Sequence, residues 1–160
     1  MKVERMQADQ VQTYGEALKK LLHICTDISF SGEISRDFYE EKLKALRCYL
    51  QKDQACLLGA FHQGQLVGFL WGYGLPDPLG EKFHIAYLAV LPEYERQGIG
   101  SQLIREAQTQ AQKMGLNRAE LLVTQDNEQA LAFYREQGFC VRRYILEKKF
   151  QDGKKKRDLQ

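Results

Sequence analysis

The sequence predicts an α/β fold: a single domain in which a mixed central sheet is flanked by helices on both faces. Segments with the apolar runs or alternation typical of β-strands lie between segments whose apolar residues recur at helical spacing. The length of 160 residues suits one domain, and no linker or internal repeat divides it. Residues 1–150 are therefore predicted to form the domain, followed by a polar, basic tail over 151–160.

The composition narrows the possible classes of protein. Hydrophobic and charged residues make up 44% and 28% of the chain, which is ordinary for a globular protein, and a net charge of +2 favours no nucleic-acid partner. No apolar run approaches the roughly 18 residues of a membrane span, and residues 1–5 lack a signal-peptide pattern, so we expect a cytoplasmic protein without a membrane partner. The four cysteines form no C-x-x-C pair, which predicts reduced thiols and no metal site.

The N-terminal third is predicted to contain one short strand and two helices. Residues 2–7 form the strand, and apolar residues at helical spacing predict one helix over 9–25. The segment 26–35 mixes Asp, Ser and Gly and is interpreted as a loop, and a second helix follows over 35–50. The expected N-caps of the two helices are Asp9 and Ser35.

The rest of the chain is predicted to alternate strands and helices after an initial hairpin. Strands over 55–61 and 65–73 are joined by a tight turn, and a connection rich in Gly and Pro leads to a strand over 82–90. Gly138 is expected to end the last helix in a left-handed conformation. The later elements are a helix over 99–114, a strand over 118–124, a helix capped by Asp126 or Asn127 and continuing to Gln137, and a strand over 139–150.

Gly98 and Gly100 stand where the helix over 99–114 begins. Glycine allows a ligand to approach the backbone closely, and the free N–H groups and positive dipole of a helix N-terminus favour an anion. The stretch is therefore a candidate cradle for a phosphate or pyrophosphate, although a tight turn without a ligand explains these two residues equally well. No Lys-Ser/Thr follows and no third Gly is present, which excludes a P-loop and a dinucleotide fingerprint.

The order of elements and two local patterns resemble the GNAT superfamily of N-acetyltransferases, which use acetyl-CoA. The stretch from Glu95 to Gly100 is similar to that family's [Arg/Gln]-x-x-Gly-x-[Gly/Ala] pyrophosphate loop. The stretch from Asn127 to Phe139 is similar to its Asn-x-x-Ala-x-x-[Phe/Leu]-Tyr-x-x-x-Gly-Phe signature. The family usually has Arg or Gln where this chain has Glu95, but its phosphate contacts come chiefly from backbone N–H groups, and the resemblance extends over about residues 61–150.

The resemblance implies a binding mode for acetyl-CoA and a general acid. The backbone of the strand ending at Val90 would pair with the pantetheine arm, and Tyr134 would protonate the leaving thiolate. Asn127 and Tyr134 are seven residues apart, so a helix returns them to one side within about 20°. The alternative interpretation is that Asn127 only caps the helix and that Tyr134 is only an aromatic residue of the core. The predicted cofactor-binding residues are Leu88, Ala89, Val90, Arg96, Gln97, Gly98, Ile99, Gly100, Ser101, Asn127 and Tyr134.

A base is also needed, because an alkyl amine is almost fully protonated at neutral pH and deprotonating it costs about 4.6 kcal/mol. His84 occupies what looks like the position at which some GNAT enzymes place a catalytic Glu, and a neutral imidazole is well suited to accept a proton. It is equally consistent with the sequence that His84 is an ordinary, half-exposed histidine of the strand with no catalytic role. Glu81, Asp77, Tyr73 and ordered water are the other candidates.

The acceptor remains the least specified component. The predicted function is transfer of an acetyl group to a primary amine of a small molecule, directly within a ternary complex; a protein or peptide amine, a non-catalytic acyl-CoA-binding module and a nucleotide-binding interaction domain are the alternatives. Asp27 and Glu33 are candidates to attract a cationic amine, unless they are solvated loop acids. Trp71 and Tyr73 are candidates to line an acceptor pocket, unless they belong to the core. A homodimer is expected only because dimers are frequent in the family.

Overall fold

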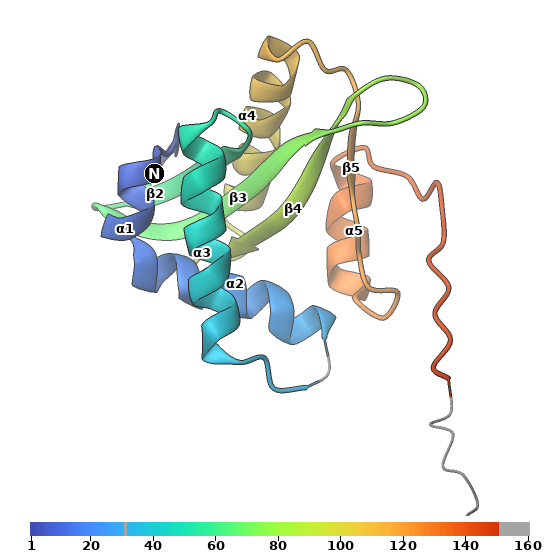
Figure 1. The fold of residues 1–160 in the computed structure, drawn as a ribbon, viewed down its shortest axis with the longest axis horizontal. Helices are drawn as coiled ribbons and strands as arrows, with labels where there is room; N and C mark the ends of the chain where they lie inside the picture. Colours follow the sequence, from blue (N-terminus) through green and yellow to red (C-terminus); the bar gives the residue numbers. More distant parts are fainter. Residues whose placement is uncertain (31, 151–160) are drawn as a thin grey trace, which may run out of the picture.

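The computed structural model describes residues 1–30 and 32–150. Five strands form one sheet in the order β1-β2-β3-β4-β5 (Figure 1). Neighbouring strands are antiparallel from β1 to β4, whereas β5 pairs in parallel with β4. The prediction of a mixed sheet is therefore confirmed. The strands are β1 (Lys2–Arg5), β2 (Cys56–His62), β3 (Gln65–Leu75), β4 (Lys82–Val90) and β5 (Ala119–Leu121).

Helices cover both faces of the sheet, as predicted (Figure 1). One face is packed against α1 (Ala8–Thr13), α2 (Gly15–Ser29) and α3 (Arg36–Gln51), and the other against α4 (Ile99–Lys113). A short 3-10 helix, η1 (Pro92–Tyr94), separates β4 from α4, and α5 (Glu128–Glu136) follows β5. Among residues 1–30 and 32–150, no helix combines the length and the apolar character that a membrane span requires.

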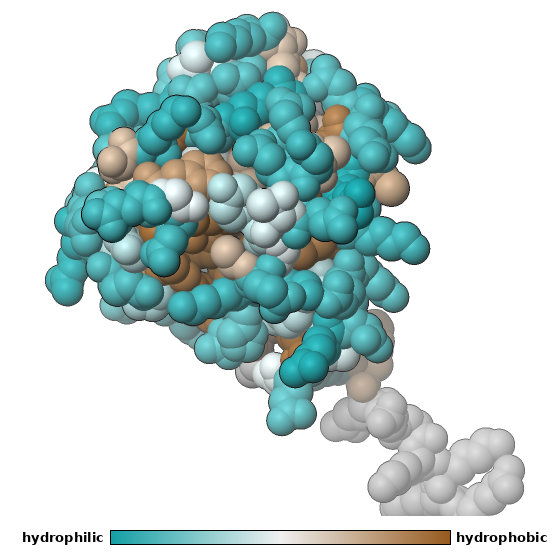
Figure 2. Space-filling model, turned by 90° about the vertical axis from the view of Figure 1, so that its left-hand side faces the viewer, coloured by the Kyte–Doolittle hydropathy of each residue, from teal (hydrophilic) through white to brown (hydrophobic). Residues whose placement is uncertain are grey.

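Alternation along β2 divides the apolar side chains between two cores. Leu57 and Phe61 face the α1–α3 layer, whereas Leu58 and Ala60 face α4, and all four are buried. Burying a leucine completely contributes about 1.5–3 kcal/mol to stability, so both layers gain from this strand. On the face shown in Figure 2, hydrophilic side chains predominate and apolar surface is visible mainly between them.

The single helix predicted over 9–25 is wrong, because the chain forms two helices that meet at Tyr14. Tyr14 has φ of −101° and ψ of 20°, outside regular helical geometry, and serves both as the C-cap of α1 and as the N-cap of α2. The N-cap of α1 is Gln7 and not Asp9. The backbone N–H of Gln7 donates to Oε1 of Gln10 at 2.8 Å, a reciprocal contact of the capping-box kind.

The loop predicted over 26–35 is also partly wrong, because α2 continues to Ser29. Thr26 is buried, and its hydroxyl lies 3.1 Å from the carbonyl oxygen of Leu22 and 2.7 Å from the hydroxyl of Tyr39 in α3. Contact with α3 therefore keeps in the helix a segment whose Asp and Ser content favours a loop. Ser35 caps α3 as predicted, by accepting from the backbone N–H of Phe38.

The strand predicted over 139–150 is wrong: these residues form no strand, and the side chains of Tyr144 and Leu146 are 86% and 93% exposed. The strand predicted over 118–124 is shortened to the three residues of β5. In the described part of the chain no further strand pairs with β5, so the β-forming side chains of 139–150 have no ladder to join. The tail 151–160 lies outside the described residues.

Candidate active site

β4 continues beyond the point where its pairing with β5 ends. The last paired residues are Ile85 and Leu121, and the register of β4 with β3 shifts at Ala86, which is a bulge. No strand of the described chain pairs with residues 86–90 on their β5-facing side. We call this side of residues 86–90 the open edge.

The backbone groups at the open edge follow from the β3–β4 ladder. The N–H of Leu91 donates to the carbonyl oxygen of Val67 at 2.8 Å, so Leu91 directs its N–H towards β3. Directions alternate along an antiparallel strand, so the polar groups of Ala89 also face β3 and those of Leu88 and Val90 face the open edge. Of the three strand residues predicted to bind cofactor, two thus present backbone donors and acceptors there.

Cys25 of α2 reaches the open edge, a contact that the sequence did not indicate. Its thiol donates to the carbonyl oxygen of Leu88 over 3.3 Å. Burial raises the pKa of Cys25 to about 12, so the thiol stays protonated and remains a donor at neutral pH. The N–H of Leu88 and the polar groups of Val90 are left for another partner.

The loop after η1 has the geometry of an anion cradle. Arg96 and Gly98 both have left-handed φ angles, of 56° and 77°. Gly98 is the N-cap of α4, and the first helical bond comes from the N–H of Gln102 to the Gly98 carbonyl oxygen at 3.0 Å. The N–H groups of residues 99–101 therefore have no intrahelical acceptor. A Cβ at Gly98 would meet no heavy atom within 4 Å, so the space beside it is open.

Gly100 has a different physical role from Gly98. A Cβ on Gly100 would lie only 3.0 Å from Cζ of Phe133, so glycine at this position allows α4 to pack closely against α5. One residue further, Oγ of Ser101 accepts from Nε2 of Gln137 at 3.0 Å. These contacts fix α5 to the first turn of α4. The side chain of Gln97 donates to the Glu93 carbonyl oxygen at 3.3 Å and so stabilises the loop itself.

Asn127 opens α5 and acts as its cap. Its Oδ1 accepts from the N–H of Ala130 at 3.1 Å, so the cap that the sequence analysis gave as an alternative is present. Asn127 also lines a cavity of about 260 Å³ between the end of α2 and the start of α5, together with Ile28, Ser29, Thr124 and Asp126. The Asn127 side chain is therefore positioned at a cavity while it caps the helix. Gly138, with φ of 87°, ends the helix region as predicted.

Tyr134 packs on the α4 side of the sheet and lies near Cys25, the residue whose thiol reaches the open edge. Its ring centroid lies 5.1 Å from that of Phe133 and 5.7 Å from that of Phe139, and Leu88 packs against the same core. Burial, together with the nearby Cys25, raises the pKa of Tyr134 to about 12. The phenol is thus protonated at neutral pH, as a general acid must be.

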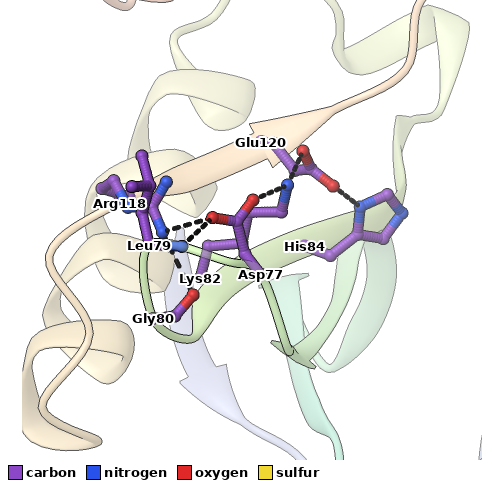
Figure 3. A network of polar contacts seen from close by, with 7 residues as sticks. All are labelled: Asp77, Leu79, Gly80, Lys82, His84, Arg118 and Glu120. Atoms are coloured by element: carbon purple, nitrogen blue, oxygen red, sulfur yellow. Dashed lines mark hydrogen bonds and ion pairs between the residues drawn. The ribbon is translucent and has the colours of Figure 1, made fainter.

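His84 belongs to a chain of ionic contacts between β4, β5 and the β3–β4 connection (Figure 3). Its Nδ1 lies 3.1 Å from Oε1 of Glu120, and its side chain is 14% exposed. The other carboxylate oxygen of Glu120 is 2.6 Å from Nζ of Lys82, which also lies 2.9 Å from Asp77. Arg118 donates to Asp77 at 3.1 Å. No sequence pattern marks Glu120, because only the parallel pairing of β4 and β5 brings it to His84.

The other candidate bases lie in settings that differ from that of His84. Asp77 accepts from the backbone N–H of Leu79 and from Lys82 and Arg118, and these contacts hold its pKa well below its usual range. A carboxylate held so strongly in its ionised form is a poor base. Glu81 is exposed, and the ring of Tyr73 lies 5.2 Å from that of His84.

The residues expected near the acceptor fall into two groups. Asp27 and Glu33 are exposed. Trp71 is only 4% exposed and packs in the α1–α3 core, with its ring 5.3 Å from that of Tyr87 on β4. Its Nε1 has no hydrogen-bond partner among the described residues. Within the same residues, no group of three or more His, Cys, Asp or Glu side chains could hold a metal ion.

Comparison with protein families decides the identity of this arrangement. The model of the acetyltransferase (GNAT) family matches residues 16–139, which include the open edge, the loop at Gly98 and α5. The chain belongs to the GNAT family. The resemblance inferred from the two local patterns is thereby confirmed.

Curated relatives of this GNAT chain include enzymes with different names. N-acetyltransferase family 8 member 3 of Rattus norvegicus is 32% identical over 95 residues, which cover 58% of this chain and 42% of the relative. Mycothiol acetyltransferase of Thermomonospora curvata is 32% identical over 111 residues, covering 69% of this chain and 36% of the relative. The matched region thus spans less than half the length of these relatives.

Solved structures share the fold at low sequence identity. An aminoglycoside N-acetyltransferase in complex with CoA has a TM-score of 0.76 and 18% identity, with 92% of this chain and 93% of that chain covered. A predicted acetyltransferase of Clostridium acetobutylicum, solved with acetyl-CoA, has a TM-score of 0.75 and 15% identity, with 92% and 95% covered. A ribosomal-protein-alanine N-acetyltransferase of Brucella melitensis has a TM-score of 0.69 and 21% identity, with 94% and 100% covered.

Proposed function

We propose that this GNAT protein is an N-acetyltransferase that moves the acetyl group of acetyl-CoA directly to a primary amine of a small molecule within a ternary complex. The observation that carries the proposal is the open edge. It is a stretch of unpaired strand backbone that leads into the N-terminus of α4, with Tyr134 beside it and His84 before it on the same strand. The family membership and the two neighbours solved with CoA or acetyl-CoA support the cosubstrate.

The proposed binding mode uses backbone groups throughout. The pantetheine arm pairs with the N–H and C=O groups of Val90, and the diphosphate accepts hydrogen bonds from the N–H groups of residues 98–101. The helix N-terminus carries about half a positive charge, which favours the diphosphate by about 0.3–1 kcal/mol at an exposed site. Glu95 and Arg96 are both exposed, so their opposite charges offset each other in solvent.

The proposed chemistry removes two protons from the acceptor nitrogen and supplies one proton to the CoA sulfur. His84 takes a proton from the ammonium group of the acceptor, directly or through a water molecule. The neutral amine then attacks the thioester carbonyl carbon, the carbon–sulfur bond breaks, and Tyr134 gives its phenolic proton to the thiolate. The nitrogen of the product loses its second proton, which returns to the Tyr134 phenolate through water, so that an amide, a free thiol and a restored phenol result. The N–H of Leu88 faces the open edge and is the donor that we assign to the developing oxyanion. Alignment of the two bound reactants contributes about 7–11 kcal/mol, more than either proton transfer.

The test combines binding with turnover. Calorimetric titration should detect acetyl-CoA binding, and a thiol-release assay over a library of small amines should identify at least one acceptor. Peptide and protein amines are assayed as a separate arm. Turnover only in that arm would replace the small-molecule acceptor by a protein one, and failure to bind acetyl-CoA would refute the proposal altogether.

A non-catalytic acyl-CoA-binding module is the second candidate function. Glu95 favours it, because an acidic side chain stands beside the expected diphosphate at a position where the family usually has Arg or Gln. Acetyl-CoA binding without thiol release from any amine would support this second candidate. A homodimer also stays a prediction, which sedimentation analysis of the free and acetyl-CoA-bound protein would test.

A further inference from the structure

Glu120 uses its two carboxylate oxygens for two different partners (Figure 3). Oε1 faces Nδ1 of His84 at 3.1 Å, and Oε2 faces Nζ of Lys82 at 2.6 Å. The parallel register places His84 directly opposite Glu120 on the neighbouring strand, so both side chains leave the sheet on the same face. The contact is therefore set by the sheet and does not depend on a flexible loop.

This contact has a chemical consequence for the imidazole. A carboxylate accepts hydrogen bonds and donates none, so Nδ1 must carry the proton when His84 is neutral. The lone pair then lies on Nε2, on the opposite side of the ring from Glu120. Only Nε2 is available to take a proton from an incoming amine.

Lys82 completes the arrangement by holding Glu120 in its ionised form. The hydrogen bond from Lys82 is the main cause that lowers the pKa of Glu120, and the hydrogen bond from His84 adds to it. Asp77 binds the same ammonium group at 2.9 Å, and Arg118 binds Asp77 in turn. Lys82 is thus held between two carboxylates, those of Glu120 and Asp77.

We propose that Glu120 is a positioning residue that fixes His84 in the Nδ1-protonated tautomer and presents Nε2 to the acceptor amine. This rests on the proposed function, in which His84 is the base. The charged and titratable groups that face or stack on His84 are Glu120 of β5, Lys82 of the same strand and Tyr73 of β3. The ring of Tyr73 packs against that of His84 in a tilted arrangement, with centroids 5.2 Å apart and planes 43° apart, so that the hydrogen bond to Glu120 sets the tautomer.

Nuclear magnetic resonance gives a readout that does not require turnover. The protein has three histidines, so long-range proton–nitrogen correlations can be assigned with a His84→Ala variant. The wild type should contain neutral His84 protonated at Nδ1. Glu120→Gln has one acceptor oxygen for two donors, so that oxygen should stay with Lys82, the amide NH2 should face Nδ1, and His84 should shift to the Nε2-protonated tautomer, whereas Glu120→Leu should mix the two tautomers. A wild type protonated at Nε2, or a Glu120→Leu spectrum with the tautomer unchanged, would overturn the proposal.

Kinetics of the same variants tests the link to catalysis. Both Glu120 variants should lower kcat, by no more than His84→Ala does, and leave the affinity for acetyl-CoA unchanged. The double variant His84→Ala/Glu120→Leu should be no slower than His84→Ala, because the two residues act as a unit.

Glu4→Gln is the matched control. Glu4 is a strand glutamate at the opposite edge of the sheet, it is paired with Lys2, and its loss should change neither the His84 tautomer nor the pH profile. Independent, multiplicative losses in the double variant would contradict the positioning role. A wild type that binds acetyl-CoA but acetylates no amine would refute the proposed function instead, and the tautomer measurement would still decide the role of Glu120.

Discussion

The two halves of β4 supply different kinds of groups to the candidate site. Before the bulge at Ala86 the strand is paired on both sides and contributes side chains, of which His84 is the main one. After the bulge it is paired only with β3 and contributes backbone N–H and C=O groups at the open edge. The difference suggests two separate roles: backbone N–H and C=O groups bind the cosubstrate, and side chains from separate elements transfer the protons.

This division has a consequence for mutations. Side chains at the open edge can change without removing the donors and acceptors, whereas a proton donor or acceptor is lost with a single substitution. Changes at Tyr134 and His84 should therefore act on turnover, and changes at Gly98 on binding of the cosubstrate. The predictions below test whether the two classes separate in this way.

The largest decrease in turnover is expected for Tyr134→Phe. The substitution removes the phenolic proton and leaves the ring packing against Phe133 and Phe139 in place. We expect kcat to fall on the order of 10²- to 10³-fold, as for loss of a general acid, with little change in the Kd of acetyl-CoA or in Tm. Steady-state kinetics and calorimetric titration of the same preparation measure this. Unchanged turnover would remove Tyr134 from the mechanism.

His84→Ala should have the next largest effect and a distinct signature. Without the base, the reaction requires an amine that is already neutral, so kcat/KM should fall about 10²-fold at neutral pH and its optimum should move to alkaline pH. The pH–rate profile from pH 6 to 10 is the measurement. A profile of unchanged shape would show that water or another residue takes the proton, and the side-chain half of β4 would lose its proposed role.

Much of the fold follows from local sequence patterns, since periodicity and caps are short-range properties. The hairpin of β2 and β3, the strand β4 and the helices α4 and α5 lie where the apolar patterns predict them. The extent of α2 could not be predicted in this way, because its last turn is stabilised by a contact between Thr26 and Tyr39 of another helix. The predicted strand over 139–150 failed for a related reason, since a strand requires a neighbour that sequence patterns do not reveal.

The same distinction applies to the site. The loop at Gly98 and the α5 residues are contiguous in sequence, so a short pattern was enough to identify them. Glu120 contacts His84, which is 36 positions away in the sequence, and Cys25 contacts Leu88, which is 63 positions away. No local sequence pattern marks either residue. The sequence pattern marks Gly100 as part of a phosphate loop, whereas in the structure its missing Cβ makes room for Phe133.

The two glycines of the loop should therefore respond differently to alanine. At Gly98 the left-handed φ of 77° lowers the stability of the fold by about 1–2 kcal/mol for an L-residue. The new Cβ also narrows the open space beside the free N–H groups of the loop, which acts on ligand binding. We expect a roughly tenfold weaker Kd for CoA, the factor that corresponds to about 1.4 kcal/mol, with no loss for a pantetheine fragment that lacks the diphosphate. At Gly100 the new Cβ crowds Phe133, so Tm should fall with less than about a threefold change in Kd.

Phe133→Leu provides the matched test of this assignment. If Gly100 serves packing, the smaller side chain should restore part of the Tm lost in Gly100→Ala. It should restore nothing in Gly98→Ala, whose Cβ meets no atom of Phe133. Equal losses of CoA affinity at both positions would instead mean that both glycines approach the ligand, and the packing role of Gly100 would be wrong.

The smallest effect on turnover is expected for Asp77→Asn, which affects stability through the side-chain half of β4. Hydrogen bonds from Leu79, Lys82 and Arg118 lower the pKa of Asp77 in the folded state, so ionised Asp77 stabilises the fold above its unfolded pKa of about 3.9. That stabilisation is lost as the pH falls below this value towards the folded pKa. The difference in Tm between wild type and Asp77→Asn should therefore be largest at pH 6–7 and shrink below about pH 4. A difference that stays constant with pH would mean that packing of the β3–β4 connection, and not the charge of Asp77, supports the paired half of β4.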